Sequence, residues 1–354
     1  MTQATPINSG YLYAIISAVL LGASTPAAKY FLGEIHPVLL AGLFYLGSGL
    51  GVLIILSVRH LISSHIAESN LKRSDWKWLL IAILCGGIMA PAMLMVGLTR
   101  TNAATASLLL NFESVFTALT AWLLFKEHTS RHIIFGMALI ISGGFILGWS
   151  KSFNVGLVAG MLFIIAACFL WALDNNVTRN ISATDPLKIV CIKSLVAGIT
   201  NTTLAFAIGA TLPNHMLLGM TTFVGFVGYG ISLVCFILAL RHIGTGRTGA
   251  YFSLAPFIGA SLAVLFLGEP LTIQLVLAGC LMGWGTWLHL TEYHSHEHLH
   301  DELTHDHRHV HDEHHQHEHQ PGDPKGEPHS HSHTHERLIH SHPHFPDTHH
   351  RHKH

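Results

Sequence analysis

Two sets of residues in this sequence could do chemistry, and they lie in very different surroundings. The first set begins with Glu113, which stands in a long apolar run two residues after Asn111. A carboxylate in the apolar zone of a membrane is costly, and that cost makes it a candidate for function. We expect Glu113 to bind a solute or a coupling proton. The alternative is that a neighbouring helix holds it for packing.

Another apolar run ends in a polar cluster that belongs to the same set. This cluster consists of Trp171, Asp174, Asn175 and Asn176. Three consecutive polar residues point around most of a helical turn, so at least one should face a cavity. The alternative is a helix end at the membrane surface, where Asp174 would pair with Arg179 or Lys193. We expect the long side chain of Lys193 to reach that surface.

The second set is a C-terminal tail that holds most of the 31 histidines of the chain. They alternate with other residues in groups: His294, His296, His298 and His300; His305, His307, His309 and His311; His314, His315, His317 and His319; His329, His331, His333 and His335; and further groups after residue 339. In an extended chain, alternate side chains lie on one side, so two imidazoles of an H-x-H motif can reach one ion.

The composition of this tail is typical of a segment that binds divalent transition metals. Imidazoles with interleaved carboxylates, such as those of Asp306 and Glu313, suit Zn²⁺, Ni²⁺, Co²⁺ or Cu²⁺, and the tail has no Cys or Met. The alternatives are a pH-responsive polyelectrolyte and chance low-complexity sequence. The tail has few apolar residues, so we expect it to be disordered without metal. We expect no required cofactor.

The rest of the chain is apolar enough to be a membrane protein. Hydrophobic residues make up 50% of the sequence and charged residues only 11%, which excludes an ordinary soluble domain. A helix needs roughly 20 mostly apolar residues to span a bilayer. Ten stretches qualify: 11–31, 38–58, 78–99, 103–125, 133–150, 155–175, 187–209, 216–240, 248–267 and 271–290. The predicted fold class is an all-α membrane protein of ten transmembrane helices, with lipid and no nucleic acid as its partner.

The distribution of Lys and Arg predicts the orientation in the membrane. If the N-terminus is cytoplasmic, the inner loops hold Arg59, Lys72, Arg73, Lys77, Lys126, Arg131, Arg179, Lys188, Arg241 and Arg247. The outer loops then hold only Lys29, Arg100 and Lys151. Positive residues favour the cytoplasmic side, and an even number of spans returns the chain to it. We therefore expect a multi-pass protein of the cell inner membrane with both termini in the cytoplasm.

The apolar part contains one pattern twice. Asn111–Glu127 and Ser253–Glu269 share a polar start, a long apolar run and a final Glu, at an offset of 142 residues. Each half has five predicted spans, so the second half is inverted relative to the first. We divide the chain into a first repeat at 11–150, a second at 153–291 and the tail at 294–354. The first copy has the acid Glu113 and the second has Pro256. We expect the solute to bind where the two copies differ in this way.

These motifs give the apolar part a family resemblance. A long apolar helix, then L-F-K-E at 124–127 or F-L-G-E at 266–269, then a Thr and a Gly-rich apolar helix resembles the drug/metabolite transporter superfamily. The chain is most similar to EamA-type ten-helix exporters over about residues 11–290. The Glu-Pro that this family favours is split here between Glu113 and Pro256, and its Trp-Ala pair is Trp171-Ala172. The resemblance implies two inverted five-helix repeats, a central cavity and transport of small organic solutes, often outward and coupled to protons. The tail is not part of this pattern.

No nucleophile with a neighbouring base stands out, so we do not expect an enzyme. We expect a secondary transporter that exports a small solute, either an organic metabolite, a divalent transition metal or a chelate of one. The tail favours a metal, whereas the apolar part has no His, Cys or Met cluster near the midplane and so favours an organic solute. A different class of function is a non-transporting membrane sensor or metal store that acts through the tail. The sequence is compatible with a homodimer.

Overall fold

The computed structural model describes residues 6–62, 73, 75–125, 130–149, 154–178, 181, 185–291 and four segments of the tail. The first half contains α1 (Pro6–Phe31), α2 (Pro37–Ile62), α3 (Trp76–Ala82), the π-helix η1 (Ile83–Met89), α4 (Ala90–Arg100), α5 (Ala103–Leu109), α6 (Phe112–Phe125) and α7 (Arg131–Gly148). The second half contains α8 (Val155–Thr178), α9 (Pro186–Ala207), α10 (His215–Gly225), the π-helix η3 (Phe226–Ile231), α11 (Ser232–Phe252), α12 (Ala255–Leu267) and α13 (Ile273–Leu290).

Nine helical stretches in the described residues are long and apolar enough to cross a membrane. The predicted fourth span, 103–125, is occupied by α5 and α6, which are separated at Leu110 and Asn111. The Asn111 side chain donates to the Leu108 carbonyl at 2.8 Å, and Ser114 donates to the Asn111 carbonyl at 2.7 Å. Such side-chain bonds offer the backbone an alternative to the helical ladder, which explains the break.

The chain reverses direction inside α11. The rings of Phe236 and Phe252 have centroids only 4.7 Å apart. Sixteen residues of straight α-helix would separate them by roughly 24 Å. The reversal therefore falls between the predicted eighth and ninth spans, where Gly244 and Gly246 stand in the sequence.

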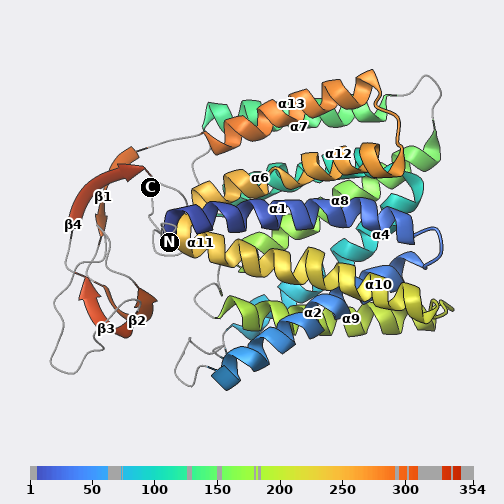
Figure 1. The fold of residues 1–354 in the computed structure, drawn as a ribbon. Coiled ribbons are helices and arrows are strands. Elements are labelled where there is room, and N and C mark those ends of the chain that lie inside the picture. Colours follow the sequence, from blue (N-terminus) through green and yellow to red (C-terminus); the bar gives the residue numbers. More distant parts are fainter. Residues whose placement is uncertain are drawn as a thin grey trace, which may run out of the picture.

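The two halves interlock rather than lie side by side. Helix α2 packs along α9, and α7 packs along α13, so each pair joins one helix from each half (Figure 1). Helix α1 lies against α11 and α12, while α8 of the second half lies against α4 and α6 of the first. The first helix of each half thus packs against the third and fourth spans of the other half, as two inverted repeats require. The core between the halves contains the fully buried Phe44, Leu94, Met95, Leu109 and Ile164.

Polar side chains cap several of the helices. Asp185 accepts from the Leu187 amide at 3.0 Å, Asn214 from Leu217 at 2.9 Å, and Thr272 from Leu275 at 3.1 Å. Each side chain satisfies an amide that has no partner within its own helix. The helix starts are therefore determined locally by residues that the loops supply.

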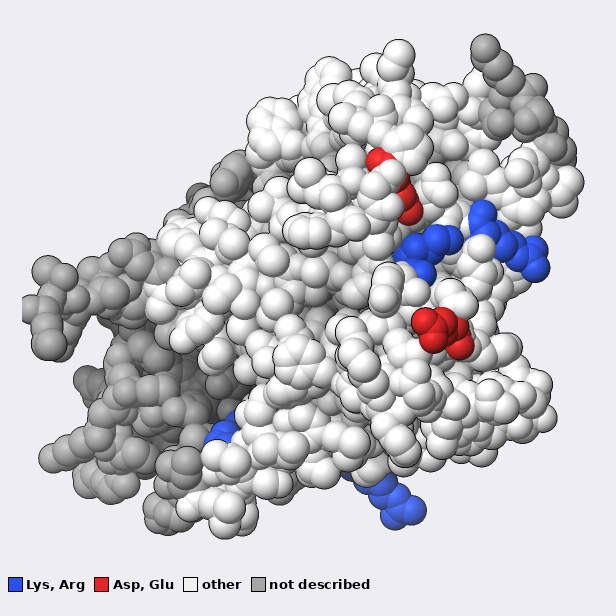
Figure 2. All heavy atoms as spheres, turned by 45° about the vertical axis from the view of Figure 1, so that its right-hand side comes forward, with Lys and Arg blue, Asp and Glu red and all other residues white. Residues whose placement is uncertain are grey.

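The outer surface is that of a protein in contact with lipid. Large apolar side chains such as Phe145, Phe223 and Phe266 are exposed. Figure 2 shows a face that is mostly uncharged, with side chains of both charges grouped toward the right and isolated basic side chains along the lower edge. Helix α1 begins and α13 ends at the same end of the bundle, from which the tail continues (Figure 1).

The described part of the tail forms strands, whereas its composition predicts disorder. The strands are β1 (Ser295–His300), β2 (Leu303–His309), β3 (His329–His335) and β4 (Leu338–Pro343). They pair as two antiparallel two-stranded sheets, β1 with β4 and β2 with β3. The strict two-residue alternation of the tail is also the period of a β-strand, which accounts for this arrangement. Six predicted metal ligands lie outside the described residues: His294, His311, His314, His315, His317 and His319.

Candidate functional site

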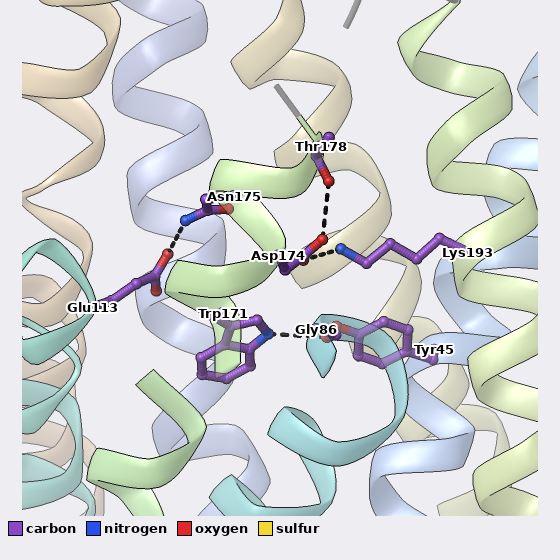
Figure 3. A network of polar contacts seen from close by, with 8 residues as sticks. All are labelled: Tyr45, Gly86, Glu113, Trp171, Asp174, Asn175, Thr178 and Lys193. Atoms are coloured by element: carbon purple, nitrogen blue, oxygen red, sulfur yellow. Dashed lines mark hydrogen bonds and ion pairs between the residues drawn. The ribbon is translucent and has the colours of Figure 1, made fainter. Parts of the chain in front are cut away.

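The two predicted polar clusters meet in the structure. The Asn175 amide of α8 donates to Glu113 Oε1 of α6 at 2.7 Å (Figure 3). Helix α6 belongs to the first half and α8 to the second, so this bond crosses between the repeats. Glu113 thus has a neutral hydrogen-bond partner and lies within the apolar part of the bundle.

Asp174, beside Asn175 on α8, forms an ion pair with Lys193 of α9. The Asp174 side chain is 5% exposed and that of Lys193 is 19% exposed. Thr178 also donates to Asp174, at 3.0 Å, from one turn further along α8. The structure thus has the Asp174–Lys193 ion pair that the sequence offered as the alternative for Asp174. A buried carboxylate and a buried amine attract each other strongly, because little water screens the two charges. This attraction offsets the cost of removing each charge from water.

The π-helix η1 brings a backbone carbonyl to the same place. The Gly86 carbonyl accepts from Trp171 Nε1 at 3.0 Å and from the Tyr45 hydroxyl at 2.9 Å (Figure 3). A Cβ on Gly86 would overlap the Asp174 carboxylate, so the close approach of η1 to α8 requires glycine. π-Helical turns interrupt the regular hydrogen-bond ladder and are frequent at functional sites.

We name these residues the central cluster and keep that name below. It comprises Tyr45, Gly86, Glu113, Trp171, Asp174, Asn175, Thr178 and Lys193 (Figure 3). Sequence reasoning missed Tyr45, Gly86 and Thr178 as members. Lys193 carried a signal, since it is an ionisable residue inside a predicted span, whereas no signal brings Tyr45 to Gly86.

The other predicted site residues lie elsewhere. The Asn111 side chain bonds to Leu108 of its own segment and accepts from Thr286 of α13 at 3.3 Å. Asn176 is buried and donates to Thr120 of α6 at 2.7 Å and to Ala172 at 2.9 Å. Pro256 is in the first turn of α12. Among the described residues, no hydrogen bond or ion pair joins the side chain of any of these three to the side chains of the central cluster.

Two polar braces join the halves near opposite ends of the bundle. Arg59 of α2 forms an ion pair with the buried Asp185 at the start of α9. At the other end, Glu269 accepts from the amides of Ala103 and Ala104 at 2.6 and 2.7 Å. Glu269 thereby satisfies the N-terminus of α5, where a negative charge is also favoured by the helix dipole.

In the part of the chain whose side chains are described, no three His, Cys, Asp or Glu residues converge. The central cluster offers carboxylates, amides, one amine and aromatic rings. Such groups suit a proton and a polar organic solute better than a soft metal ion.

The architecture is that of a multi-pass membrane protein built from two repeats, with charged residues buried where the repeats meet. The sequence comparisons agree with it. The model of the EamA-like transporter family matches residues 8–149 and again residues 158–291, so the chain belongs to this family and carries its repeat twice.

Curated proteins with similar sequences are also named as transporters. An uncharacterized transporter of Methanothermobacter thermautotrophicus is 30% identical over 296 residues, which cover 79% of this chain and 85% of that protein. The uncharacterized transporter YvbV of Bacillus subtilis is 26% identical over 80% of this chain and 91% of its own length. A solved crystal structure superposes with a TM-score of 0.59 at 17% identity, covering 79% of this chain and 95% of that one, which shows the fold. The protein is therefore a membrane transporter and not an enzyme.

Proposed function

We propose that this transporter exports a small solute from the cytoplasm and that the central cluster binds both the solute and a coupling proton. The observation that carries the proposal is the contact between Glu113 and Asn175, which unites two groups singled out from sequence and joins one repeat to the other. In inverted-repeat transporters the solute site lies between the repeats, and the repeats move against each other around it.

The charge balance of the central cluster supports an exchange at Glu113. Lys193 neutralises Asp174, whereas the Glu113 carboxylate accepts a hydrogen bond from the neutral amide of Asn175. An ionised carboxylate with only an amide partner is costly within a membrane. Glu113 is therefore neutralised either by a proton or by a cationic group of the solute. Exchange of one for the other would couple export to proton entry.

The side chains of the central cluster support one kind of solute over another. Trp171 and Tyr45 supply aromatic surface, and the Glu113 carboxylate accepts hydrogen bonds. We therefore favour an organic metabolite with a cationic or hydrogen-bonding group over a bare divalent metal. A metal or its chelate is the second candidate, because the tail is built of imidazoles and would load it from the cytoplasm.

Export can be tested with a substitution that removes only the exchangeable charge. We expect Glu113→Gln to abolish proton-dependent efflux in cells that express the chain, with normal protein levels in the membrane. Glu34→Gln is the matched control, because Glu34 is exposed in the loop between α1 and α2. The measurement is the cellular content of metabolites and of metals with each variant. Unchanged efflux with Glu113→Gln would contradict the proposal.

A truncation after Tyr293 separates the transporter from a metal store or sensor. Metal tolerance lost with both Glu113→Gln and the truncation indicates metal export. Tolerance lost on truncation alone indicates storage or sensing through the tail. If neither change affects metal content while Glu113→Gln raises an internal metabolite, an organic solute is the cargo.

A further inference from the structure

The corner between α4 and α5 is held at both of its helix ends by a charged side chain. Lys29, in the last turn of α1, donates from Nζ to the carbonyls of Leu98 and Thr101 at 2.6 and 2.7 Å. Glu269, which follows α12, accepts from the first two amides of α5 at 2.6 and 2.7 Å. A cation suits the end of a helix and an anion suits its start, so each charge stands at the helix end that favours it. We call these two side chains, with the corner 98–104 that they hold, the corner clamp.

Beneath the corner clamp, the helices that it joins meet almost without side chains between them. A Cβ added to Gly22 of α1 would lie 2.5 Å from the Ala255 carbonyl oxygen of α12, and one added to Gly259 of α12 would lie 2.8 Å from the Gly22 oxygen. The added Cβ of Gly259 would also lie 2.8 Å from the hydroxyl oxygen of Ser107 of α5. Small residues let membrane helices approach closely. Helices α1, α12 and α5 therefore form a tight seam.

Ser107 is buried in this seam with an unsatisfied hydroxyl. The residue is 1% exposed, and its oxygen has no hydrogen-bond partner among the described residues. A buried hydroxyl without a partner is unfavourable, and folded proteins retain few of them. Opening of the seam would let water reach this hydroxyl. The seam thus combines close packing with a polar group that favours its opening.

The corner clamp lies between the central cluster and one end of the bundle. Helices α1 and α12 both end on the side away from the start of α1 and the end of α13 (Figure 1). From Ala103 the chain passes Ser107 before it reaches Glu113, so the seam separates the central cluster from that end. The side chains of Lys29 and Glu269 are both partly exposed, unlike the buried Asp174. Water can therefore solvate both charges if the corner clamp opens.

We propose that the corner clamp is a gate, which closes the central cluster off from this end of the bundle and opens when the solute leaves. Alternating access requires contacts between the repeats to break at one end while the other end closes. Glu269 belongs to the second repeat and the amides that it binds belong to the first, so their contact crosses the repeats. Lys29 keeps α1 against the same corner. This inference rests on the movement of the repeats that the proposed function assumes.

The corner clamp differs from a simple ion pair in one testable respect. Exchanging the charges, with Lys29→Glu and Glu269→Lys in one chain, would preserve an ion pair. In the corner clamp the same exchange places an anion against carbonyls and a cation against amides, and both contacts become repulsive. The chain with exchanged charges should therefore resemble a chain without the corner clamp.

The test measures how fast a cysteine at position 107 reacts with a thiol reagent in the full-length protein in detergent. Every chain carries Ser107→Cys, and separate chains add Lys29→Met, Glu269→Gln or the charge exchange. Lys29→Arg is the matched control, because it keeps a cation at the end of α4. Peptide mass spectrometry reads position 107 apart from the native cysteines. Among these, Cys191 is 5% exposed and lies against α2, so it reports general loosening of the fold.

We expect Lys29→Met, Glu269→Gln and the charge exchange each to raise the reaction rate at position 107 at least about tenfold, because each weakens two hydrogen bonds of a charged group that favour the closed state. Lys29→Arg should react as slowly as the chain with Ser107→Cys alone, and Cys191 should stay unreactive throughout. The gate is overturned by an unchanged rate in both single variants, by slow reaction after the charge exchange, or by an equal rise at Cys191. The measurement involves neither efflux nor Glu113, so a failure of the proposed export mechanism would appear separately, in Glu113→Gln.

Discussion

The two halves of the membrane part contain the same backbone irregularity in different surroundings. The π-helix η1 covers Ile83–Met89, and an offset of 142 residues carries this range to 225–231, where η3 covers Phe226–Ile231. Gly86 corresponds in this way to Gly228. The first π-helix lies against Asp174, Lys193 and Trp171, whereas the second has no charged neighbour among the contacts described for it.

The surroundings of η3 are apolar or hydroxylic. A Cβ on Gly228 would come within 3.0 Å of Ser24 Cβ, and Tyr229 packs its ring 5.8 Å from that of Phe44. Duplication thus accounts for the position of the two π-helices, whereas side-chain choice gave only one of them ionisable partners. The chemical asymmetry of the transporter lies in those side chains rather than in its backbone plan.

The largest expected effect comes from separating the ion pair beside η1. Lys193→Met should lower the free energy of unfolding by roughly 3–5 kcal/mol, because it leaves the Asp174 charge buried without its partner. Thermal unfolding in detergent measures this loss, and Lys77→Met, at an exposed lysine, is the control. The double variant Asp174→Asn with Lys193→Met should recover part of the stability. A double variant as unstable as the worse single one would mean that the two charges do not stabilise each other.

The two equivalent glycines allow the comparison to be made directly. Gly86→Ala should cost roughly 1–3 kcal/mol, because its methyl group displaces the Asp174 carboxylate from a packed site. Gly228→Ala should cost less, since its nearest obstacles are Ser24 Cβ at 3.0 Å and the Leu20 carbonyl at 3.5 Å. Both variants should be measured for unfolding and for efflux, and only Gly86→Ala should lower efflux. Equal losses in the two would show that η1 has no special role.

The smallest effect concerns the two donors of the Gly86 carbonyl. Trp171→Phe and Tyr45→Phe should each cost roughly 0.5–1.5 kcal/mol, because each leaves the carbonyl with one hydrogen bond. The double variant should cost more than their sum, since the buried carbonyl then loses both partners. Unfolding of the four chains tests this, with Tyr30→Phe as an exposed control. Strict additivity would indicate that water replaces the lost donors.

The sequence predicted part of the candidate site but not its connections. Glu113 and the Asp174–Asn176 cluster were recognisable, because ionisable residues are rare in apolar runs. For Asp174 the sequence offers Arg179 or Lys193 as a partner, and only the structure shows the pair with Lys193. The sequence groups Asn111 with Glu113 because they are two residues apart, and Pro256 because the second copy of the repeat has the proline where the first has the acid. In the structure the Asn111 side chain accepts from Thr286 of α13, and Pro256 lies in the first turn of α12.

The sequence by itself determined the membrane class, the two repeats and the family, because hydrophobic length, repeat spacing and motif residues are local properties of the chain. It also determined that Glu113 is costly to bury. Only the tertiary structure decided that Asn175 is its partner, that Lys193 binds Asp174, and that a π-helix aims the Gly86 carbonyl at Trp171 and Tyr45. The contacts of Asn175 with Glu113 and of Trp171 with Gly86 join the two halves, whereas the other two join helices within one half. The geometry of all four depends on helix packing that no stretch of sequence encodes alone.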